Sequence, residues 1–92
     1  MDWQTPPADF CSVTFERVNP AKDESRFYYL GWQPTLFGDK AMVRIWGRKS
    51  GRRRSLTRPF ASLEEAWPAF RTIIKTRLRH GYHLVEPEKY VI

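Results

Sequence analysis

A single helical pattern, preceded by segments typical of strands, most constrains what this 92-residue chain can form. Ser62 and Glu65 have the spacing of a capping box, in which each side chain satisfies a backbone N–H at the start of a helix. Apolar side chains then recur at helical spacing, namely Leu63, Ala66, Trp67, Phe70, Ile74 and Leu78. Gly81 suits the left-handed position that ends a helix. One amphipathic helix is therefore predicted over residues 62–80.

Four segments before this helix are predicted to be strands. Residues 11–18 alternate apolar and polar side chains with period two, and residues 26–32 are dense in rings on both faces, as expected of a central strand. Residues 41–48 and 55–60 follow, each after a turn. Strands followed by one helix predict an α+β fold, in which an antiparallel meander of four to five strands carries the helix on one face.

The chain has the length of one small domain. We divide it into an N-terminal arm (residues 1–10), the domain itself (residues 11–84) and a C-terminal tail (residues 85–92). Trp3 and Phe10 of the arm are expected to dock on the domain. The tail is a candidate edge strand, since it contains Val85 and the apolar end at Tyr90.

The cysteine count and the lack of targeting or membrane-spanning segments indicate the cellular compartment. Cys11 is the single cysteine, which excludes an intramolecular disulfide and favours a reducing compartment. The N-terminus lacks a basic region followed by an apolar stretch, and no segment approaches membrane-spanning length. We therefore expect a cytoplasmic monomer that does not bind membranes.

Positive charge is concentrated in the middle of the sequence. The net charge is +6, and eight Lys or Arg residues lie between Lys40 and Arg58 with no Asp or Glu among them. Neighbours in sequence cannot neutralise this block, so it favours an anionic partner such as nucleic acid.

The predicted strand over residues 41–48 separates two kinds of side chain. Val43 and Ile45 go to one face, whereas Arg44, Trp46 and Arg48 go to the other. Burying Trp46 would bring two arginines toward the core, where unpaired charges are costly. We therefore expect the helix to cover the face of Val43 and Ile45, and Trp46 to be available to a partner.

These segments resemble the WGR domain family, which is named for the tripeptide that here is Trp46, Gly47 and Arg48. The matching features cover roughly residues 12–84. They are the aromatic strand 26–30, Gly51 after the tripeptide, the strand end Arg58-Pro59-Phe60, and the helix that opens at Ser62 and closes at Gly81-Tyr82. The resemblance implies the same sheet-and-helix architecture. It also implies that Trp46 packs against the sugar at the terminus of a DNA strand, as in members that detect DNA breaks, and that Arg48 supports the DNA-bound arrangement.

The leading hypothesis is a DNA-binding module, with DNA ends or breaks as the expected target. Its predicted DNA-contacting residues are Arg44, Trp46, Arg48, Lys49, Arg52, Arg53, Arg54 and Arg58. The alternative is a protein-interaction or regulatory module that uses the same surface, because Trp and Arg also dominate protein interfaces.

Catalysis finds little support in the sequence. His80 and His83 are too few ligands for a metal site, and neither a nucleophile with its base nor a glycine-rich nucleotide loop is present. The resemblance agrees, since the poly(ADP-ribose) polymerases of the family place catalysis in another domain. We expect no enzymatic activity, no metal and no cofactor.

Overall fold

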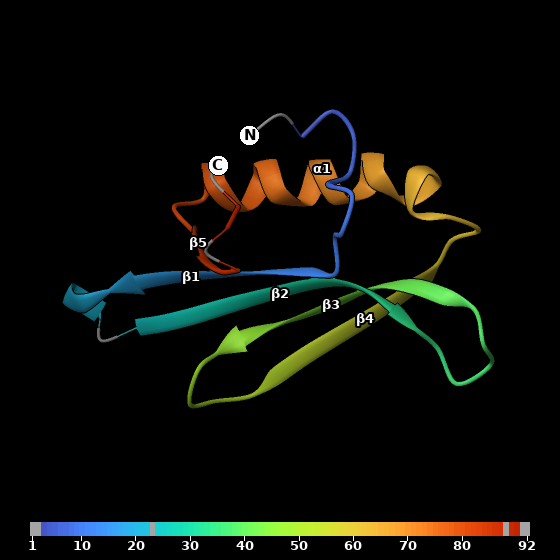
Figure 1. The fold of residues 1–92 in the computed structure, drawn as a ribbon. Helices are drawn as coiled ribbons and strands as arrows, with labels where there is room; N and C mark the ends of the chain where they lie inside the picture. The colour runs from blue at the N-terminus through green and yellow to red at the C-terminus, as the bar shows by residue number, and fades with distance from the viewer. Residues whose placement is uncertain (1–2, 23, 88, 91–92) are drawn as a thin grey trace.

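The computed structural model describes residues 3–22, 24–87 and 89–90. Along the chain lie β1 (Ser12–Asn19), the 3-10 helix η1 (Pro20–Lys22), β2 (Glu24–Pro34), β3 (Lys40–Arg48), β4 (Arg53–Pro59), α1 (Leu63–Arg79) and β5 (His83–Glu86). The five strands form one antiparallel sheet in the order β4-β3-β2-β1-β5, and α1 lies across one face (Figure 1). The predicted α+β fold is confirmed.

Helix α1 begins and ends where the capping residues predict. The Ser62 hydroxyl accepts a hydrogen bond from the Glu65 backbone N–H at 3.1 Å. At the other end, Gly81 has a φ of 86°. Its N–H donates to the Leu78 carbonyl, and the next N–H along the chain donates to Arg77, which together form a Schellman motif. Within the described residues, no helix is both long and apolar enough to cross a membrane.

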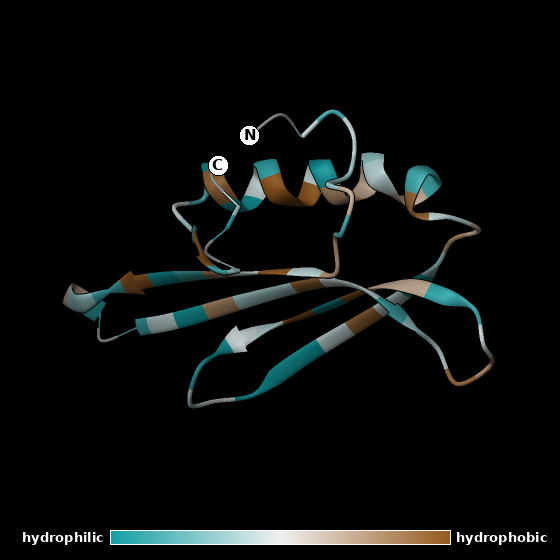
Figure 2. Cartoon of the chain, viewed as in Figure 1, coloured by the Kyte–Doolittle hydropathy of each residue, from teal (hydrophilic) through white to brown (hydrophobic). Residues whose placement is uncertain are grey.

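The core lies between α1 and the sheet. Its main side chains are Val13, Phe15, Tyr28, Leu30 and Met42 from the strands and Ala66, Trp67, Phe70 and Ile74 from the helix. Hydrophobic positions on α1 accordingly turn toward the sheet (Figure 2).

The N-terminal arm completes this core, as expected of Trp3 and Phe10. The Trp3 ring stacks on Trp67 at 5.8 Å between centroids, and the Trp67 indole N–H donates to the Trp3 carbonyl at 2.7 Å. Phe10 is buried and meets the Trp67 ring edge to face at 5.0 Å.

A fifth strand is present, but it begins before the tail. β5 pairs with β1 through Phe15 and Leu84 and ends at Glu86. Pro87 follows and has no N–H to continue the ladder, which explains the early end. Tyr90 returns to the core beside Phe10. Residues 88, 91 and 92 of the predicted tail lie outside the described residues.

The sheet face that α1 covers differs from the expectation. Met42 belongs to the core beneath the helix and Trp46 packs against it, whereas Ile45 and Phe27 line a hollow that the helix does not reach. The prediction that the helix covers Val43 and Ile45 is therefore wrong. We call the covered side, which carries Tyr28, Met42, Arg44 and Trp46, the helix-side face; we call the other, which carries Phe27, Tyr29, Val43 and Ile45, the open face.

Candidate nucleic-acid interface

Trp46 lies on the helix-side face among arginines from three strands. The register of the sheet pairs Trp46 with Tyr28 on one side and with Arg54 on the other. One step further along, Arg48 pairs with Arg26. Side chains of directly paired residues point to the same face of a sheet, so these five residues form one neighbourhood.

The Arg44 guanidinium lies beside the core, where it has a hydrogen-bond acceptor and ring contacts. Its Nε–H donates to the Tyr28 hydroxyl at 2.6 Å. Its guanidinium carbon lies 5.3 Å from the Trp46 ring centroid and 5.8 Å from that of Tyr28. The two rings stack on each other at 5.7 Å with an interplanar angle of 18°. A guanidinium that has a hydrogen bond and two ring faces avoids much of the cost of partial burial, which is why Trp46 can pack against the core although Arg44 shares its strand face.

A hollow of about 370 Å³ opens where the cover of α1 ends. It is lined by Arg26, Trp46, Gly47, Arg48, Arg52 and Arg54. Trp46 is half-buried, with the stacked Tyr28 on its inner side. The hollow therefore combines part of an aromatic side chain with four arginines, which come from three strands and the β3–β4 loop.

Gly47 gives the hollow its shape. It has a φ of 156°, and a Cβ at this position would lie 2.3 Å from the Arg52 carbonyl oxygen. The close approach brings the turn after β3 back against the strand, and a side chain at position 47 would force the turn to shift. The glycine of the tripeptide thus holds Arg52 and Arg53 at the end of the β3–β4 hairpin.

The arginine and ring pattern continues from Tyr28 toward the C-terminal end of α1. The Arg77 guanidinium lies 4.7 Å from the Tyr28 ring and 5.4 Å from that of Tyr82. Arg17 covers the Tyr82 ring at 5.1 Å. Rings and guanidinium groups therefore alternate from Arg17 to Trp46 along this side of the molecule.

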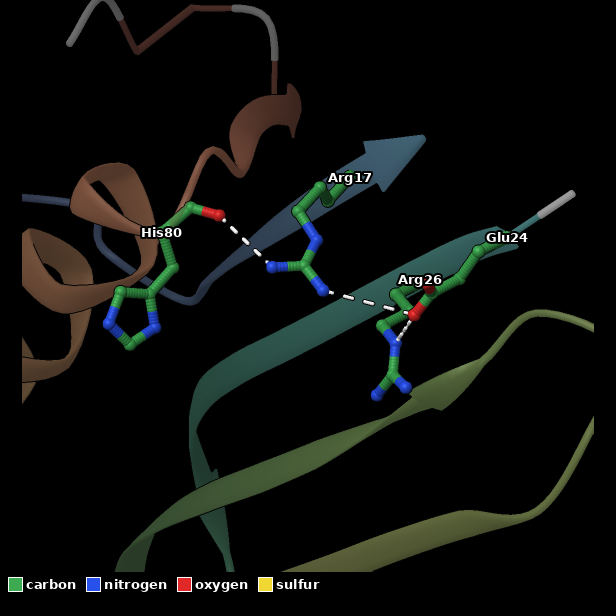
Figure 3. A network of polar contacts seen from close by, with 4 residues as sticks. All are labelled: Arg17, Glu24, Arg26 and His80. Atoms are coloured by element: carbon green, nitrogen blue, oxygen red, sulfur yellow. Dashed lines mark hydrogen bonds and ion pairs between the residues drawn. The ribbon is translucent and has the colours of Figure 1, made fainter. Parts of the chain in front are cut away.

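One carboxylate lies within this basic surface. Glu24 accepts a hydrogen bond from Arg26 Nε and forms an ion pair with Arg17 at 3.8 Å, and Arg17 also donates to the His80 carbonyl at 3.2 Å (Figure 3). The bond from Arg26 holds the pKa of the Glu24 carboxyl below its usual value of 4.5, and the same contact raises the pKa of Arg26. Glu24 thus orders two arginines at the edge of the hollow.

The eight predicted contact residues do not share one face. The helix-side face holds Arg44, Trp46, Arg48, Arg54 and Arg58, and Arg52 joins them in the hollow. Lys49 and Arg53 instead line the open face, where Lys49 Nζ lies 2.7 Å from Glu16 and the Arg53 guanidinium lies 4.9 Å from the Phe27 ring.

Three arginines of this surface were not predicted from the sequence: Arg17, Arg26 and Arg77. Arg26 borders the aromatic segment that supports the family resemblance, yet only the pairing of β2 with β3 sets it opposite Arg48. Arg77 comes from the helix end, and its Nε is buried with no hydrogen-bond partner among the described residues. The spacing of charges in the sequence therefore does not predict that Arg26 or Arg77 belongs to this surface.

Comparisons with known proteins identify the family of this chain. The model of the WGR domain family matches residues 11–89. The chain is also 30% identical over 67 residues to uncharacterized protein y4dW of Sinorhizobium fredii (strain NBRC 101917 / NGR234), a match that covers 73% of this chain and 33% of that protein. The chain thus spans about a third of the length of this relative. No solved structure matches the chain significantly. The match to the family model over most of the chain shows that it belongs to the WGR domain family.

Proposed function

We propose that this protein binds duplex DNA through the helix-side face around Trp46, and that it prefers strand ends. The observation that carries the proposal is the hollow, in which Trp46 lies among Arg26, Arg48, Arg52 and Arg54. Arginine forms a planar fork that matches phosphate, and an aromatic side chain stacks on bases or sugars.

The distribution of charge between the two faces supports this choice. On β2, β3 and β4, the helix-side face carries six cations, Arg26, Lys40, Arg44, Arg48, Arg54 and Arg58, against the single acid Glu24. The same three strands place one charged residue, Arg53, on the open face. A polyanion is therefore attracted to the side that holds Trp46.

Preference for ends follows from the position of Trp46. Bases inside an intact duplex already stack on one another, so an aromatic side chain must break that stacking to reach them. A strand end or nick exposes a sugar and a base face without this cost. Stacking on an aromatic side chain contributes roughly 1 to 3 kcal/mol, which corresponds to about a 5- to 150-fold preference for ends.

The proposal is tested by competition between a linear fragment and a closed circle of the same sequence, with a labelled short duplex as the probe. The wild-type protein should be displaced better by the linear fragment. Its affinity should fall with salt, with a slope of log K against log salt near −3.6 if about four phosphates are neutralised. Equal competition by both DNAs would contradict the preference for ends and would indicate a general basic DNA-binding surface.

Absence of binding in about 50 mM salt contradicts the DNA proposal itself. The same titration with an acidic peptide and with heparin then distinguishes the alternative. Tight binding of the peptide, lost in Trp46→Ala, would indicate a protein partner for this surface.

A further inference from the structure

The open face combines two features that α1 and the arginine surface do not explain. One is the loop between β2 and β3, where Leu36 is 99% exposed and Phe37 is 91% exposed. Figure 2 shows the hydrophobic tip of this loop projecting beyond the sheet. Exposed apolar side chains that lie together, unlike single ones, are typical of interaction sites.

The second feature is a partly apolar hollow of about 670 Å³ that extends along the same face from Phe27 to Gln33. Its lining combines Phe27, Tyr29 and Ile45 with the polar side chains of Thr14, Glu16, Gln33, Lys49 and Arg53. The Tyr29 side chain lies close over Gly31, since a Cβ there would be 2.5 Å from the Tyr29 hydroxyl.

We propose that the open faces of two copies of this chain pack against each other in a two-fold symmetric dimer, with the loop of each copy in the hollow of the other. Phe27 and Leu36 are nine residues apart along β2 and its loop, a distance of about 30 Å in extended chain. A two-fold axis between the sheets and perpendicular to the strands reverses the strand direction. It places the loop of one copy over the hollow of its partner, and the converse contact forms at the same time.

Charge complementarity favours a second copy as the occupant. Asp39, in the loop beside Phe37, makes no ion pair among the described residues, and neither does Arg53 at the edge of the hollow. The two-fold arrangement brings the carboxylate of one copy toward the guanidinium of the other, twice in each dimer. The cations of the helix-side face point away from this contact, so their mutual repulsion is weak there.

The available area is sufficient for a stable contact. The molecule is flat, with extents of 42 × 30 × 19 Å. An overlap of about two thirds of its broad face provides the roughly 800 Å² per partner that stable interfaces bury. The proposed dimer, in place of the monomer expected from the sequence, leaves both helix-side faces free.

Sedimentation equilibrium of the full chain from about 10 μM to 1 mM tests the dimer. The mass should rise from 11.0 kDa toward twice that value with concentration. Phe37→Ser should weaken dimerisation at least about tenfold, as for a truncated hot-spot residue. Leu56→Ser is the matched control, since Leu56 is an apolar side chain 47% exposed on the helix-side face, and it should leave the mass unchanged.

Charge reversal tests the arrangement of the two copies. Asp39→Arg and Arg53→Asp should each weaken the dimer, and the double variant should regain most of the loss because the pair is restored with opposite sign. A wild-type mass of 11.0 kDa at every concentration overturns the proposal. A dimer insensitive to Phe37→Ser, or without recovery in the double variant, overturns it as well. None of these outcomes depends on DNA binding.

Discussion

Arg44 donates its Nε–H to the Tyr28 hydroxyl at 2.6 Å, and its guanidinium lies against the Trp46 ring. This contact joins the buried core to the arginine surface, because Tyr28 is 2% exposed whereas Trp46 borders the hollow. Arg44 therefore positions the two stacked rings more than it reaches into solvent. The relationship explains how one strand face carries both a core residue, Met42, and the proposed DNA-binding surface.

This contact should have a measurable coupling energy. Tyr28→Phe keeps the ring and removes the acceptor, so it should lower the free energy of unfolding by about 1 kcal/mol. Arg44→Met should lower it as well, and the double variant should cost about 0.5 to 1.5 kcal/mol less than the sum of the two. Urea unfolding of the four proteins gives the coupling. Strict additivity would mean that the hydrogen bond contributes nothing.

Because α1 covers the face of Trp46 and not that of Ile45, Trp46 should contribute more to the stability of the folded protein than Ile45. Trp46 packs against the core and stacks on Tyr28, whereas Ile45 is half-buried on the open face. Trp46→Ala should therefore destabilise by roughly 1 to 3 kcal/mol, below the 3 to 5 of a fully buried ring, and Ile45→Ala by less. Denaturant midpoints of both variants test this. Greater damage from Ile45→Ala would support the face assignment expected from the sequence.

Gly47→Ala should disturb the β3–β4 hairpin. The added Cβ would lie 2.3 Å from the Arg52 carbonyl oxygen, so the turn has to move away from the strand. We expect a loss of about 2 kcal/mol or more, together with weaker DNA binding. Gly38→Ala provides a control, since Gly38 also has positive φ, at 88°, but no atom within 4 Å of the added Cβ. Amide chemical shifts of residues 47–54 should change in the first variant alone.

Glu24 should make stability depend on pH in the acid range. Its pKa in the folded protein is below the usual 4.5, so its stabilising contribution is complete above that pH and is lost as pH falls through the lowered value. Glu24→Gln removes this dependence. The wild-type protein should be the more stable at pH 7, and the difference should shrink toward pH 3. A difference that stays constant between these values contradicts the role of the ionised carboxylate.

Local patterns were sufficient to predict most of the fold. The capping residue Ser62 and the terminating Gly81 set the ends of α1, and alternation and rings located β1 to β4. The fifth strand was placed too late, because a four-residue edge strand ending before Pro87 carries no distinctive pattern.

The candidate site was less predictable, because it depends on contacts between strands. Alternation correctly separated Ile45 from Trp46 but cannot say which of two mixed faces the helix covers. The cost of burying Arg44 favours the face of Val43 and Ile45, but the Tyr28 hydroxyl and the rings offset that cost. The cluster at residues 52–58 likewise looks continuous in sequence, although the strand sends Arg53 and Arg54 to opposite faces.

These last two neighbours provide the most direct test of the central claim, that DNA binds the helix-side face around Trp46. Arg53→Ala and Arg54→Ala remove the same charge from adjacent exposed positions of β4. Titration of a labelled duplex over a range of salt should show that Arg54→Ala weakens binding and reduces the salt slope by about 1, whereas Arg53→Ala changes both little. Equal losses in the two variants, or a larger loss in Arg53→Ala, would contradict the assignment of this face.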